Sequence, residues 1–530
     1  DSQIASFCGA TEAGVAALRE SMGLRHAVKR IDTCSGEFQA ETPYLYQTWE
    51  ERSEAPPTDR PKAIVLGSGP NRIGQGVEFD CCCVQAVEAI RAKGVEAILV
   101  NCNPETVSTD FDISDRLYFE PLVFEDVKAV VDREGAGGHL LGVFTQFGGQ
   151  TPLKLAQKLE AAGVPLLGTA HKAIFDAEDR NRFGEVLRKL DIPAAPWGMA
   201  SNPAQALAVA EKLHYPVMVR PSFVLGGRAM AIVFDDAGLE KYMREATLVS
   251  EDRPVLIDRY LENAQELDVD LVCDGETAVV AGVMAHIEEA GVHSGDSYAV
   301  FPPLGVPEAT LETVKAMSRA LAFQLGVRGL LNLQWALKDG VAYCLEANPR
   351  ASRTVPFISK ATGIDWAGVA ARIGLGQTLA QQGITDGVAL AVAVKGVVFP
   401  FSKFPGVDPV LGPEMKSTGE VMGVGASFGE AYAKALLAAG IPLPLHGTVF
   451  LSVNARDKGR VTDLAKLLTR MGFGICATEG TANHLEATLG LKVRRIFKVW
   501  EGRPHAVYLL KNGEIQWVVN TPRGRNAFVD

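Results

Sequence analysis

The 530-residue chain lacks the marks of several protein classes. Its most apolar stretch, Val388 to Phe401, is interrupted by Lys395 and is too short to span a bilayer, and no basic start followed by an apolar run marks a signal peptide. Basic residues are the minority, 52 against 63 acidic ones. The net charge of −11 argues against general nucleic-acid or membrane binding, because polyanions would be repelled on average. We therefore expect neither kind of partner.

The nine cysteines show no Cys-x-x-Cys pair, are odd in number and mostly lie in apolar runs. This usage is typical of reduced core thiols in a cytoplasmic protein. The chain begins at Asp1 without a methionine. We interpret it as a fragment of a longer protein or as a naturally split subunit.

The chain length and the order of strand-like and helix-like runs predict a multidomain fold with α/β and α+β parts. A chain of 530 residues should divide into about three or four domains. Between residues 62 and 167, strand-like and helix-like runs alternate, which predicts a parallel, doubly wound sheet. Longer strands after Asp179 indicate an α+β region, and the pattern after Gly440 predicts a small separate α/β domain. In the first region we predict strands 63–66, 96–100, 140–144 and 164–167 and helices 77–93, 124–133 and 152–162.

A hairpin near residue 340 gathers oxygen-bearing side chains. Glu346 and Asn348 share one face of a predicted strand, because side chains alternate along a strand with period two. The preceding apolar run carries Gln334, and the turn signal Lys338-Asp-Gly340 brings Gln334 beside Glu346. Gln, Glu and Asn oxygens without His or Cys suit a hard cation such as Mg²⁺.

Two arginines follow this hairpin directly. Arg350 and Arg353 suit the phosphates that such a cation carries, so the combination predicts an enzyme that uses a nucleoside triphosphate. The alternative is a buried Glu346 neutralised by Arg350. Three oxygen donors and two arginines within twenty residues favour a ligand, because each unpartnered buried polar group costs roughly 1–3 kcal/mol.

The familiar phosphate-binding loops are absent from the sequence. The run Gly67 to Gly76 follows a strand and opens a helix, but Arg72 stands where a dinucleotide fingerprint needs glycine. The next strand ends in Asn101 rather than in an acid for ribose. We interpret this run as a tight turn with structural glycines. The Walker phosphate loop is also missing, so any nucleotide is held in another way.

Three further segments fit a nucleotide site but also have structural explanations. Arg220 ends a strand ahead of Gly226-Gly227, whose N–H groups can approach an anion; taken alone, a hairpin turn explains these letters better. The segment Asp258 to Glu266 offers a backbone edge for a purine and a carboxylate for ribose, or is a charged linker. His293 lies in a glycine-flanked loop, where it serves a phosphate or is solvated.

In this order the segments resemble the ATP-grasp superfamily, and specifically the C-terminal half of the large-subunit family of carbamoyl phosphate synthetases. The resemblance covers essentially the whole chain. Its motifs are Gly69-Pro-Asn-Arg-Ile-Gly-Gln-Gly76, Asn101-Cys-Asn-Pro-Glu-Thr-Val-Ser-Thr-Asp110, Gly148-Gly-Gln-Thr-Pro-Leu-Lys154, Val219-Arg-Pro-Ser222, Gly291-Val-His-Ser-Gly-Asp296 and Asn348-Pro-Arg-Ala-Ser-Arg353.

The resemblance implies a division of the chain and a set of partners. It implies a cytoplasmic homo-oligomer that works with a glutaminase small subunit and with an N-terminal carbamate-forming half, in the same or a separate chain. The implied parts are 1–57, the end of a helical oligomerisation domain; 58–178, a pre-ATP-grasp domain; 179–440, an ATP-grasp domain; and 441–530, a methylglyoxal-synthase-like regulatory domain.

The implied reaction is phosphorylation of carbamate by ATP, which gives carbamoyl phosphate for arginine and pyrimidine synthesis. Such a transfer requires positioning and charge neutralisation. The implied cofactors are ATP, two Mg²⁺ or Mn²⁺ ions and, as a further ion, K⁺. By motif position, Gln334, Glu346 and Asn348 hold the metal ions; Arg180, Arg220, Gly226 and Gly227 hold phosphates; Asp258, Arg259 and Leu261 read adenine; and Glu266 takes the ribose. Gly291, Val292, His293 and Ser294 bind the nucleotide, with His293 near the transferred group. Arg350 and Arg353, with His293 and Asn348, are catalytic.

Relatives in this family bind a nucleotide monophosphate effector in the C-terminal domain. Glu288 and Asp296 match an ornithine pocket of activated relatives, but Gly396 stands where those carry an acid. The effector is left open among UMP, IMP, ornithine and none, and Thr478-Glu-Gly-Thr481 is also compatible with a simple strand-helix turn. The matching effector residues are Lys458, Thr478, Thr481, Lys498 and Asn520.

Two other functions fit parts of the pattern. A nucleotide-responsive regulatory and assembly module would bind ATP in this site without turnover. Another ATP-grasp ligase, such as biotin carboxylase, is the other alternative; no Met-Lys-Met biotinylation site occurs, although that carrier can be a separate chain. The intact set of Gln334, Glu346, Asn348, Arg350 and Arg353 favours catalysis.

Overall fold

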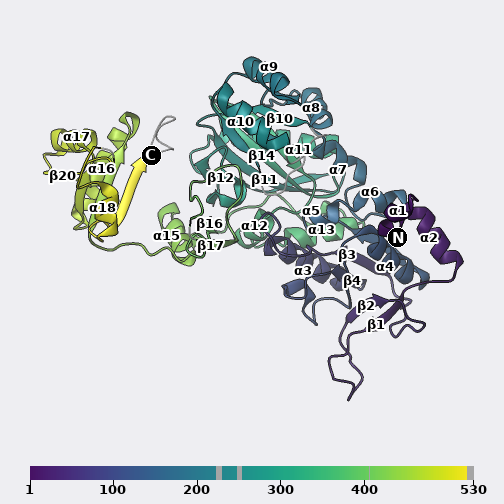
Figure 1. The fold of residues 1–530 in the computed structure, drawn as a ribbon. Coiled ribbons are helices and arrows are strands. Elements are labelled where there is room, and N and C mark those ends of the chain that lie inside the picture. The colour runs from purple at the N-terminus through teal and green to yellow at the C-terminus, as the bar shows by residue number, and fades with distance from the viewer. Residues whose placement is uncertain (222–228, 248–253, 405, 500, 522–530) are drawn as a thin grey trace. The chain divides into compact units, whose positions relative to one another are not determined.

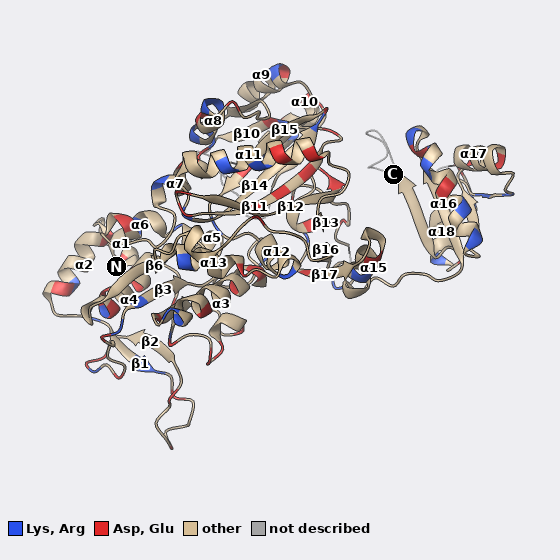
Figure 2. Cartoon of the chain, turned by 180° about the vertical axis from the view of Figure 1, so that it is seen from behind, with Lys and Arg blue, Asp and Glu red and all other residues tan. Residues whose placement is uncertain are grey.

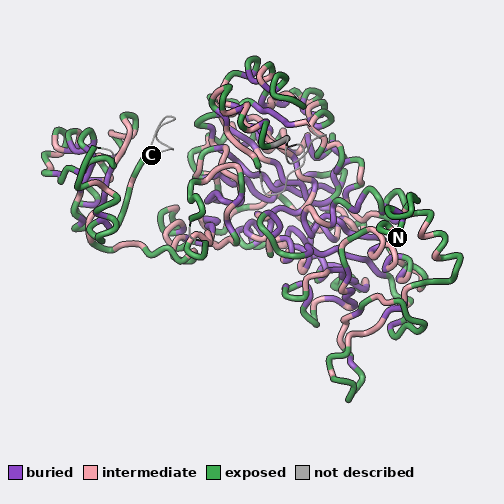
Figure 3. The backbone as a smooth tube through the Cα atoms, in the orientation of Figure 1, coloured by how far each residue is buried: buried purple, intermediate pink, exposed green. Residues whose placement is uncertain are grey.

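The computed structural model describes residues 1–221, 229–247, 254–404, 406–499 and 501–521. The chain forms two compact units, Asp1–Gly440 and Ile441–Asp530 (Figure 1). Within each unit, buried residues (purple in Figure 3) lie along the strands and the helix faces packed on them. All nine cysteines are unpaired, as predicted. Among the residues described, no helix combines the length and apolarity needed to cross a bilayer.

The first sheet of the larger unit is the predicted parallel sheet. Its strands from β2 to β6 pair in parallel, and β1 joins β2 antiparallel. All residues of β3 are buried, as expected for a strand covered on both faces. The spatial order is β1 (Ala27–Arg30), β2 (Tyr44–Thr48), β5 (Arg116–Phe119), β4 (Glu96–Asn101), β3 (Lys62–Leu66) and β6 (Leu140–Phe144).

Two predicted elements of this region differ in the structure. The predicted strand 164–167 is reduced to one bridge between Val143 and Leu166, because Pro165 has no N–H for a ladder. The predicted helix 152–162 is divided into α5 (Gln150–Leu153) and α6 (Ala156–Ala161). The other helices of this region are α1 (Ser2–Cys8), α2 (Glu12–Ser21), α3 (Val77–Ala92), α4 (Phe124–Ala136) and α7 (His171–Glu178).

A buried charge network ties the segment ahead of β3 to this sheet. Glu134, on α4, accepts a hydrogen bond from Arg116 Nε at 3.0 Å and lies 3.4 Å from Lys62 Nζ. Lys62 also donates to the Thr58 carbonyl oxygen at 2.6 Å, and Arg116 donates to that of Ala55 at 3.0 Å. Because a buried charge is tolerated only when it is paired and hydrogen-bonded, Glu134 is the group on which these two cations depend.

The second large sheet is antiparallel and carries the candidate site. On one side Leu267, Val269 and Leu271 pack with helix α11 (Glu308–Leu325). Helices α12 (Thr354–Thr362) and α13 (Trp366–Gly374) contact both this sheet and α3. The strand order is β15 (Val341–Asn348), β14 (Gly329–Lys338), β11 (Gln265–Cys273), β12 (Ala278–Glu289), β13 (Ala299–Phe301), β16 (Val392–Val398) and β17 (Gly419–Gly425).

The hairpin β14–β15 has the predicted turn and register. Asp339 and Gly340 both have positive φ angles, 50° and 80°, which is the backbone of a tight two-residue hairpin turn. Gln334 lies opposite Glu346, as predicted. The register then shifts so that Leu345 is an extra residue on β15, a β-bulge that re-aims its carbonyl oxygen.

Two smaller sheets complete the fold. One is antiparallel, in the order β7 (Trp197–Ala200), β10 (Val255–Arg259), β8 (Val217–Pro221), β9 (Ala231–Val233), with helices α8 (Arg180–Lys189), α9 (Pro203–Leu213) and α10 (Asp236–Thr247). Helices α14 (Leu379–Gln382) and α15 (Phe428–Ala438) end the larger unit. The smaller unit has the parallel order β20 (Arg494–Arg495), β19 (Gly474–Ala477), β18 (Thr448–Val453), β21 (Trp517–Thr521), with α16 (Lys458–Arg470), α17 (Glu479–Leu489) and α18 (Ala506–Lys511).

Candidate active site

One face of strand β11 carries three buried acids. Glu266, Asp268 and Asp270 alternate with the apolar residues that pack on α11, so they share the opposite face. Acidic residues, red in Figure 2, lie within the strands of this sheet. On β14, Gln334 lies opposite Asp268 and Asn332 lies opposite Asp270. Asp268 and Asp270 had no predicted role, although their period-two spacing is visible in the sequence.

The hairpin adds the predicted metal ligands to this face. Asn348 Nδ2 donates to Glu346 Oε1 at 2.8 Å, so the two side chains point the same way, as predicted. Gln334 Nε2 donates to Ser294 Oγ at 3.2 Å. The same cavity is lined by Phe79, Asp268, Ser294, Asn332, Gln334, Glu346, Asn348, Arg350, Ser352, Arg353, Thr354, Lys395 and Glu420.

The chemistry of this donor set fits a metal ion that arrives with a polyphosphate. Gln334, Glu346 and Asn348 offer hard oxygen ligands with one carboxylate among them. Across the described ranges, no group of three or more His, Cys, Asp or Glu side chains is arranged to hold a metal ion. Mg²⁺ in nucleotide enzymes is bound by one or two carboxylates plus substrate phosphates and water, which matches this set.

Arg350 and Arg353 follow β15 and line the cavity, as predicted. Arg350 Nη2 donates to Asn348 Oδ1 at 3.3 Å, and its Nε donates to Gln150 Oε1 at 3.1 Å. The guanidinium carbon lies 5.6 Å from the centre of the Phe79 ring. Burial lowers the pKa of Arg350 to about 10, which leaves it charged at neutral pH.

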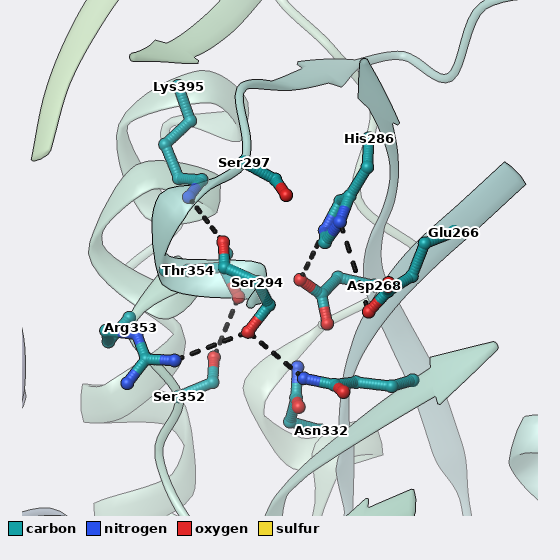
Figure 4. Close-up of polar contacts among 12 residues, drawn as sticks. Glu266, Asp268, His286, Ser294, Ser297, Asn332, Ser352, Arg353, Thr354 and Lys395 are labelled. Carbon is teal, nitrogen blue, oxygen red and sulfur yellow. Dashed lines mark hydrogen bonds and ion pairs between the residues drawn. The ribbon is translucent and has the colours of Figure 1, made fainter. Parts of the chain in front are cut away.

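Ser294, in the loop before β13, is hydrogen-bonded to Gln334 on β14 and to Arg353 after β15. Its Oγ accepts hydrogen bonds from Gln334 Nε2 at 3.2 Å and from Arg353 Nη2 at 3.3 Å. Its carbonyl oxygen accepts from Lys395 Nζ at 3.1 Å (Figure 4). Lys395 is only 1% exposed and lies 3.4 Å from Glu420 Oε1. Burial raises the pKa of Glu420 to about 6.

Asp270 holds the segment that carries Arg353. It accepts hydrogen bonds from Asn332 Nδ2 at 3.0 Å, Ser352 Oγ at 2.7 Å and Thr354 Oγ1 at 2.5 Å. Burial raises the pKa of Asp270 to about 6, although these donors favour its charged form. Asp270 therefore fixes Ser352 and Thr354, the residues on both sides of Arg353.

A buried histidine lies between two of the β11 acids (Figure 4). His286 Nε2 is 2.9 Å from Asp268 Oδ2, and its Nδ1 is 4.0 Å from Glu266 Oε1. Burial lowers the pKa of His286, but the Asp268 carboxylate outweighs it and the net shift is upward. Burial raises the pKa of Glu266 to about 7. Glu266 is 4% exposed, and its predicted contact with ribose stays a prediction.

Glu266 should make folding stability depend on pH. In the folded chain its carboxyl keeps a proton up to about pH 7, but an ordinary glutamate loses it near 4.5, so the folded state binds more protons between these values. Its contribution to stability therefore decreases as pH rises through this window. The free energy of unfolding of Glu266→Gln should therefore rise by up to about 3 kcal/mol relative to that of the wild-type chain when the pH is raised from about 5 to 7.5. Urea unfolding at both pH values measures this, and equal pH dependence in both chains would contradict it.

The two arginines predicted to hold phosphates converge on one carboxylate. Asp258, on β10, accepts a hydrogen bond from Arg180 Nη2 and lies 3.2 Å from Arg220 Nε. Arg180 Nη1 donates to the carbonyl oxygen of Leu345 at 3.0 Å, the group that the β-bulge re-aims. Gly226 and Gly227, predicted to cover the phosphates, lie outside the described residues.

His293, in the loop before β13 that also carries Ser294, is a neutral hydrogen-bond donor. Burial, together with the charge of Arg353, holds the pKa of His293 well below its usual value. Its Nδ1 accepts the Gly295 N–H at 3.0 Å, so the ring proton is on Nε2. Gly291 is required by close packing, because a Cβ there would lie 2.6 Å from the Tyr260 ring, and its φ is 106°. Val292 is half-buried.

The other predicted nucleotide residues lie at the end of β10. Arg259 is exposed and ends the strand, whereas Leu261 is 8% exposed and packs in a small apolar cluster with Ala336. The Arg259 N–H donates to the Pro196 carbonyl oxygen at 2.8 Å. Their role in adenine recognition stays a prediction.

Comparisons with known proteins match this arrangement along the chain. The carbamoyl phosphate synthase preATP-grasp domain matches residues 59–176, the ATP-binding domain of the carbamoyl-phosphate synthase L chain matches 179–382, and an MGS-like domain matches 460–530. The carbamoyl phosphate synthase large chain of Acidobacterium capsulatum is 52% identical over 541 residues, which cover 100% of this chain and 49% of the relative. The chain belongs to the carbamoyl phosphate synthase large-chain family.

Other comparisons agree with this family. The carbamoyl phosphate synthase large chain of Neisseria meningitidis serogroup A is 55% identical over 522 residues, which cover 98% of this chain and 48% of the relative. The chain thus spans about half the length of the curated relatives it matches. The biotin carboxylase domain of Hydrogenobacter thermophilus 2-oxoglutarate carboxylase, solved with MgADP, ADP and bicarbonate, has a TM-score of 0.54 and 17% identity over 69% of this chain and 86% of that chain. This likeness shows the fold, and the predicted multidomain α/β fold is confirmed.

In the unit that contains the MGS-like match, three of the predicted effector residues meet. Thr478 precedes helix α17, and its Oγ1 lies 3.5 Å from that of Thr481. The Nζ of Lys458, which opens α16, lies 3.8 Å from where a Cβ on Gly480 would be. Hydroxyls, an ammonium group and a helix N-terminus in one place suit an anion.

Of the remaining two predicted effector residues, Asn520 lies near the same edge of the sheet. Asn520, on β21, is opposite Ser452 of β18 and therefore near the carboxyl edge of the parallel sheet, where Thr478 also lies. Lys498 follows β20, and its backbone N–H donates to Glu501 at 2.9 Å.

Proposed function

We propose that this chain transfers the γ-phosphoryl group of ATP to carbamate, giving carbamoyl phosphate and ADP. The main support is that Gln334, Glu346 and Asn348 meet Arg350 and Arg353 around one cavity of a carbamoyl phosphate synthase ATP-binding domain. In this proposal the carbamate comes from a carbamate-forming half outside this chain, which is itself supplied by a glutaminase small subunit.

In this proposal the residues of the chain position the reactants and neutralise the charge of the transferred phosphoryl group. A carbamate oxygen attacks the γ-phosphorus while the bond to the ADP oxygen breaks, and negative charge spreads over the phosphoryl oxygens. Arg350 and Arg353 neutralise this charge and orient carbamate, and His293 donates from Nε2 to the transferred group. Each such contact is worth about 3 kcal/mol, or two orders of magnitude in rate.

The same proposal assigns cofactors. Gln334, Glu346 and Asn348 hold two Mg²⁺ or Mn²⁺ ions, which would neutralise and orient the phosphate oxygens. K⁺ is a further proposed ion, and Asp268 Oδ1 is a candidate ligand for it, because this buried oxygen has no hydrogen-bond partner among the residues described. These oxygen donors fit hard cations.

In this proposal, residues of the chain bind ATP at its phosphates, its adenine base and its ribose. Arg180 and Arg220, with Gly226 and Gly227, hold the phosphates. The backbone of residues 258–261 reads adenine, and Glu266 takes the ribose. Both arginines contact Asp258 in the structure, so this carboxylate holds their guanidinium groups close together before nucleotide binds.

The back-reaction tests the proposal without the missing half. The purified chain, given ADP, carbamoyl phosphate and Mg²⁺, should form ATP, because this direction needs no carbamate supply. If no ATP forms at saturating Mg²⁺ and substrates, the chain is not a carbamate kinase-type catalyst. A regulatory and assembly module that binds ATP without turnover would then be the better account. Bicarbonate-dependent ADP formation with free biotin would instead indicate a biotin carboxylase.

We also propose that the C-terminal unit binds an anionic effector such as UMP or IMP. Lys458→Ala should weaken this binding about tenfold, because a charge-assisted hydrogen bond is lost. Isothermal titration with each nucleotide measures the change. Lys466→Ala, an exposed lysine on the same helix, is the matched control and should bind like the wild-type chain. Equal affinity of the two variants would contradict the assignment of Lys458.

The wider context is part of the proposal. The parts 1–57, 58–178, 179–440 and 441–530 would be the end of an oligomerisation domain, the pre-ATP-grasp domain, the ATP-grasp domain and the regulatory domain. The chain would act in the cytoplasm as part of a homo-oligomer and supply carbamoyl phosphate for arginine and pyrimidine synthesis. Size measurement of the purified chain by light scattering tests the oligomer.

A further inference from the structure

The segment between β16 and β17 lies against the loop that carries His293 and Ser294. Residues 399–418 join the two strands, and those that the structure describes form neither helix nor strand. We call residues 408–418 the strap and residues 291–297 the site loop. Hydrogen bonds and packing connect the two along their length.

Asp296 is the central contact between the strap and the site loop. It is 0% exposed, and its two carboxylate oxygens accept the backbone N–H groups of Lys416 at 2.8 Å and Ser417 at 2.9 Å. Both acceptor oxygens of this buried carboxylate are thus used by the strap. Losing either bond would leave a buried polar group unpaired, so the contact is specific.

Further contacts extend along the site loop. The His293 N–H donates to the Gly412 carbonyl oxygen at 2.8 Å, and Ser417 Oγ donates to the Gly295 carbonyl oxygen at 2.9 Å. Met415, 8% exposed, packs against Gly295, where a Cβ would lie 2.9 Å from its sulfur. The strap therefore bonds to the residues immediately before and after Ser294.

The strap is also held to itself and to the next strand. Lys416 Nζ donates to the carbonyl oxygens of Asp408 at 2.8 Å and Val410 at 2.6 Å, which closes the strap into a compact turn. The chain then enters β17, where Glu420 lies 3.4 Å from Lys395 Nζ. Lys395 in turn donates to the Ser294 carbonyl oxygen at 3.1 Å. Ser294 is thus bonded directly by Lys395 of β16, while the strap bonds its two neighbours, His293 and Gly295.

We propose that the strap is a positioning element for phosphoryl transfer: it sets the place of Ser294 and His293 relative to Gln334 and Arg353. No strap residue lines the cavity, so the strap acts through the site loop. This inference rests on the proposed function, because the reaction it tunes is the one proposed above. Loosening the strap should slow the chemical step more than it weakens nucleotide binding, since the adenine and ribose contacts lie on other segments.

The test compares four strap variants in the full chain. Ser417→Ala removes one hydrogen bond and Met415→Ala removes the buried packing against Gly295. Glu414→Ala changes an exposed residue of the same segment and is the matched control. In the back-reaction, Ser417→Ala and Met415→Ala should lower kcat about tenfold or more while KM for ADP changes less than threefold. Met415→Leu should restore most of the rate, and Glu414→Ala should match the wild-type chain.

Hydrogen exchange provides a readout that needs no activity. Peptides covering residues 291–297 should exchange at least tenfold faster in Ser417→Ala and Met415→Ala than in the wild-type chain, and unchanged in Glu414→Ala. If Ser417→Ala and Met415→Ala both show the wild-type kcat and the wild-type exchange rate of this loop, the proposed role of the strap is wrong. A wild-type chain without back-reaction would overturn the proposed function, and hydrogen exchange would still decide whether the strap holds the loop. If Met415→Ala fails to fold, Ser417→Ala alone decides the question.

Discussion

Replacing Glu346 by glutamine is expected to reduce ATP formation from ADP and carbamoyl phosphate at least 100-fold. Glu346 is the one carboxylate among the three proposed metal ligands, and its Oε1 is already placed beside Asn348 at 2.8 Å. The amide keeps the size of the side chain and an acceptor for Asn348, but it removes the negative charge that a divalent cation requires. A lost electrostatic contact of about 3 kcal/mol corresponds to two orders of magnitude in rate.

The control for this prediction lies on the same hairpin. Asp339→Asn makes the same acid-to-amide change at the exposed turn, where asparagine also accepts the positive φ of 50°. It should leave the rate within about twofold of the wild-type value. Both variants should unfold cooperatively in urea, because neither removes core packing. A Glu346→Gln chain with normal turnover would reject the metal assignment.

Replacing Glu134 by alanine is expected to destabilise the larger unit by roughly 3–5 kcal/mol. Glu134 and Lys62 have fully buried side chains, and Arg116 shares the same carboxylate. Without Glu134, Lys62 keeps the Thr58 carbonyl oxygen, and Arg116 keeps backbone carbonyl oxygens and the Tyr118 hydroxyl, but neither buried cation keeps this carboxylate. Tyr118, whose hydroxyl donates to Glu134, also loses its acceptor. Urea unfolding of the larger unit, compared at pH 7, measures the loss.

Asp132, two residues earlier on the same helix, is the matched control. It is exposed and its partner Lys128 is a surface lysine at i−4. Asp132→Ala should cost less than about 1 kcal/mol, because exposed ion pairs contribute little. Equal losses for the two variants would show that the buried network does not depend on Glu134.

Local patterns were sufficient to predict the hairpin and its side chains. Period-two alternation placed Glu346 and Asn348 together, and the turn at Asp339 set the register with Gln334. Both signals lie within about twenty residues of sequence, and the structure bears out this geometry. The parallel first sheet was likewise visible from the alternation of strands and helices.

The other half of the site depends on which distant strands become neighbours. His286 meets Asp268 because β12 pairs with β11, and Lys395 reaches Ser294 because β16 pairs with β13. Nothing in the local sequence states these pairings, so His286, Asp268 and Lys395 had no predicted role. The convergence of Arg180 and Arg220 on Asp258 is of the same kind, since it joins three separate segments.

The central claim is that a divalent ion links a nucleotide triphosphate to Glu346 and its neighbouring amides. A crystal structure of the chain with an ATP analogue and Mn²⁺, with anomalous scattering recorded for manganese, tests it directly. The account predicts a manganese peak within about 2.0–2.3 Å of a Glu346 carboxylate oxygen and of a phosphate oxygen. Manganese bound elsewhere, or a nucleotide bound with no metal near Glu346, Gln334 or Asn348, would contradict the account.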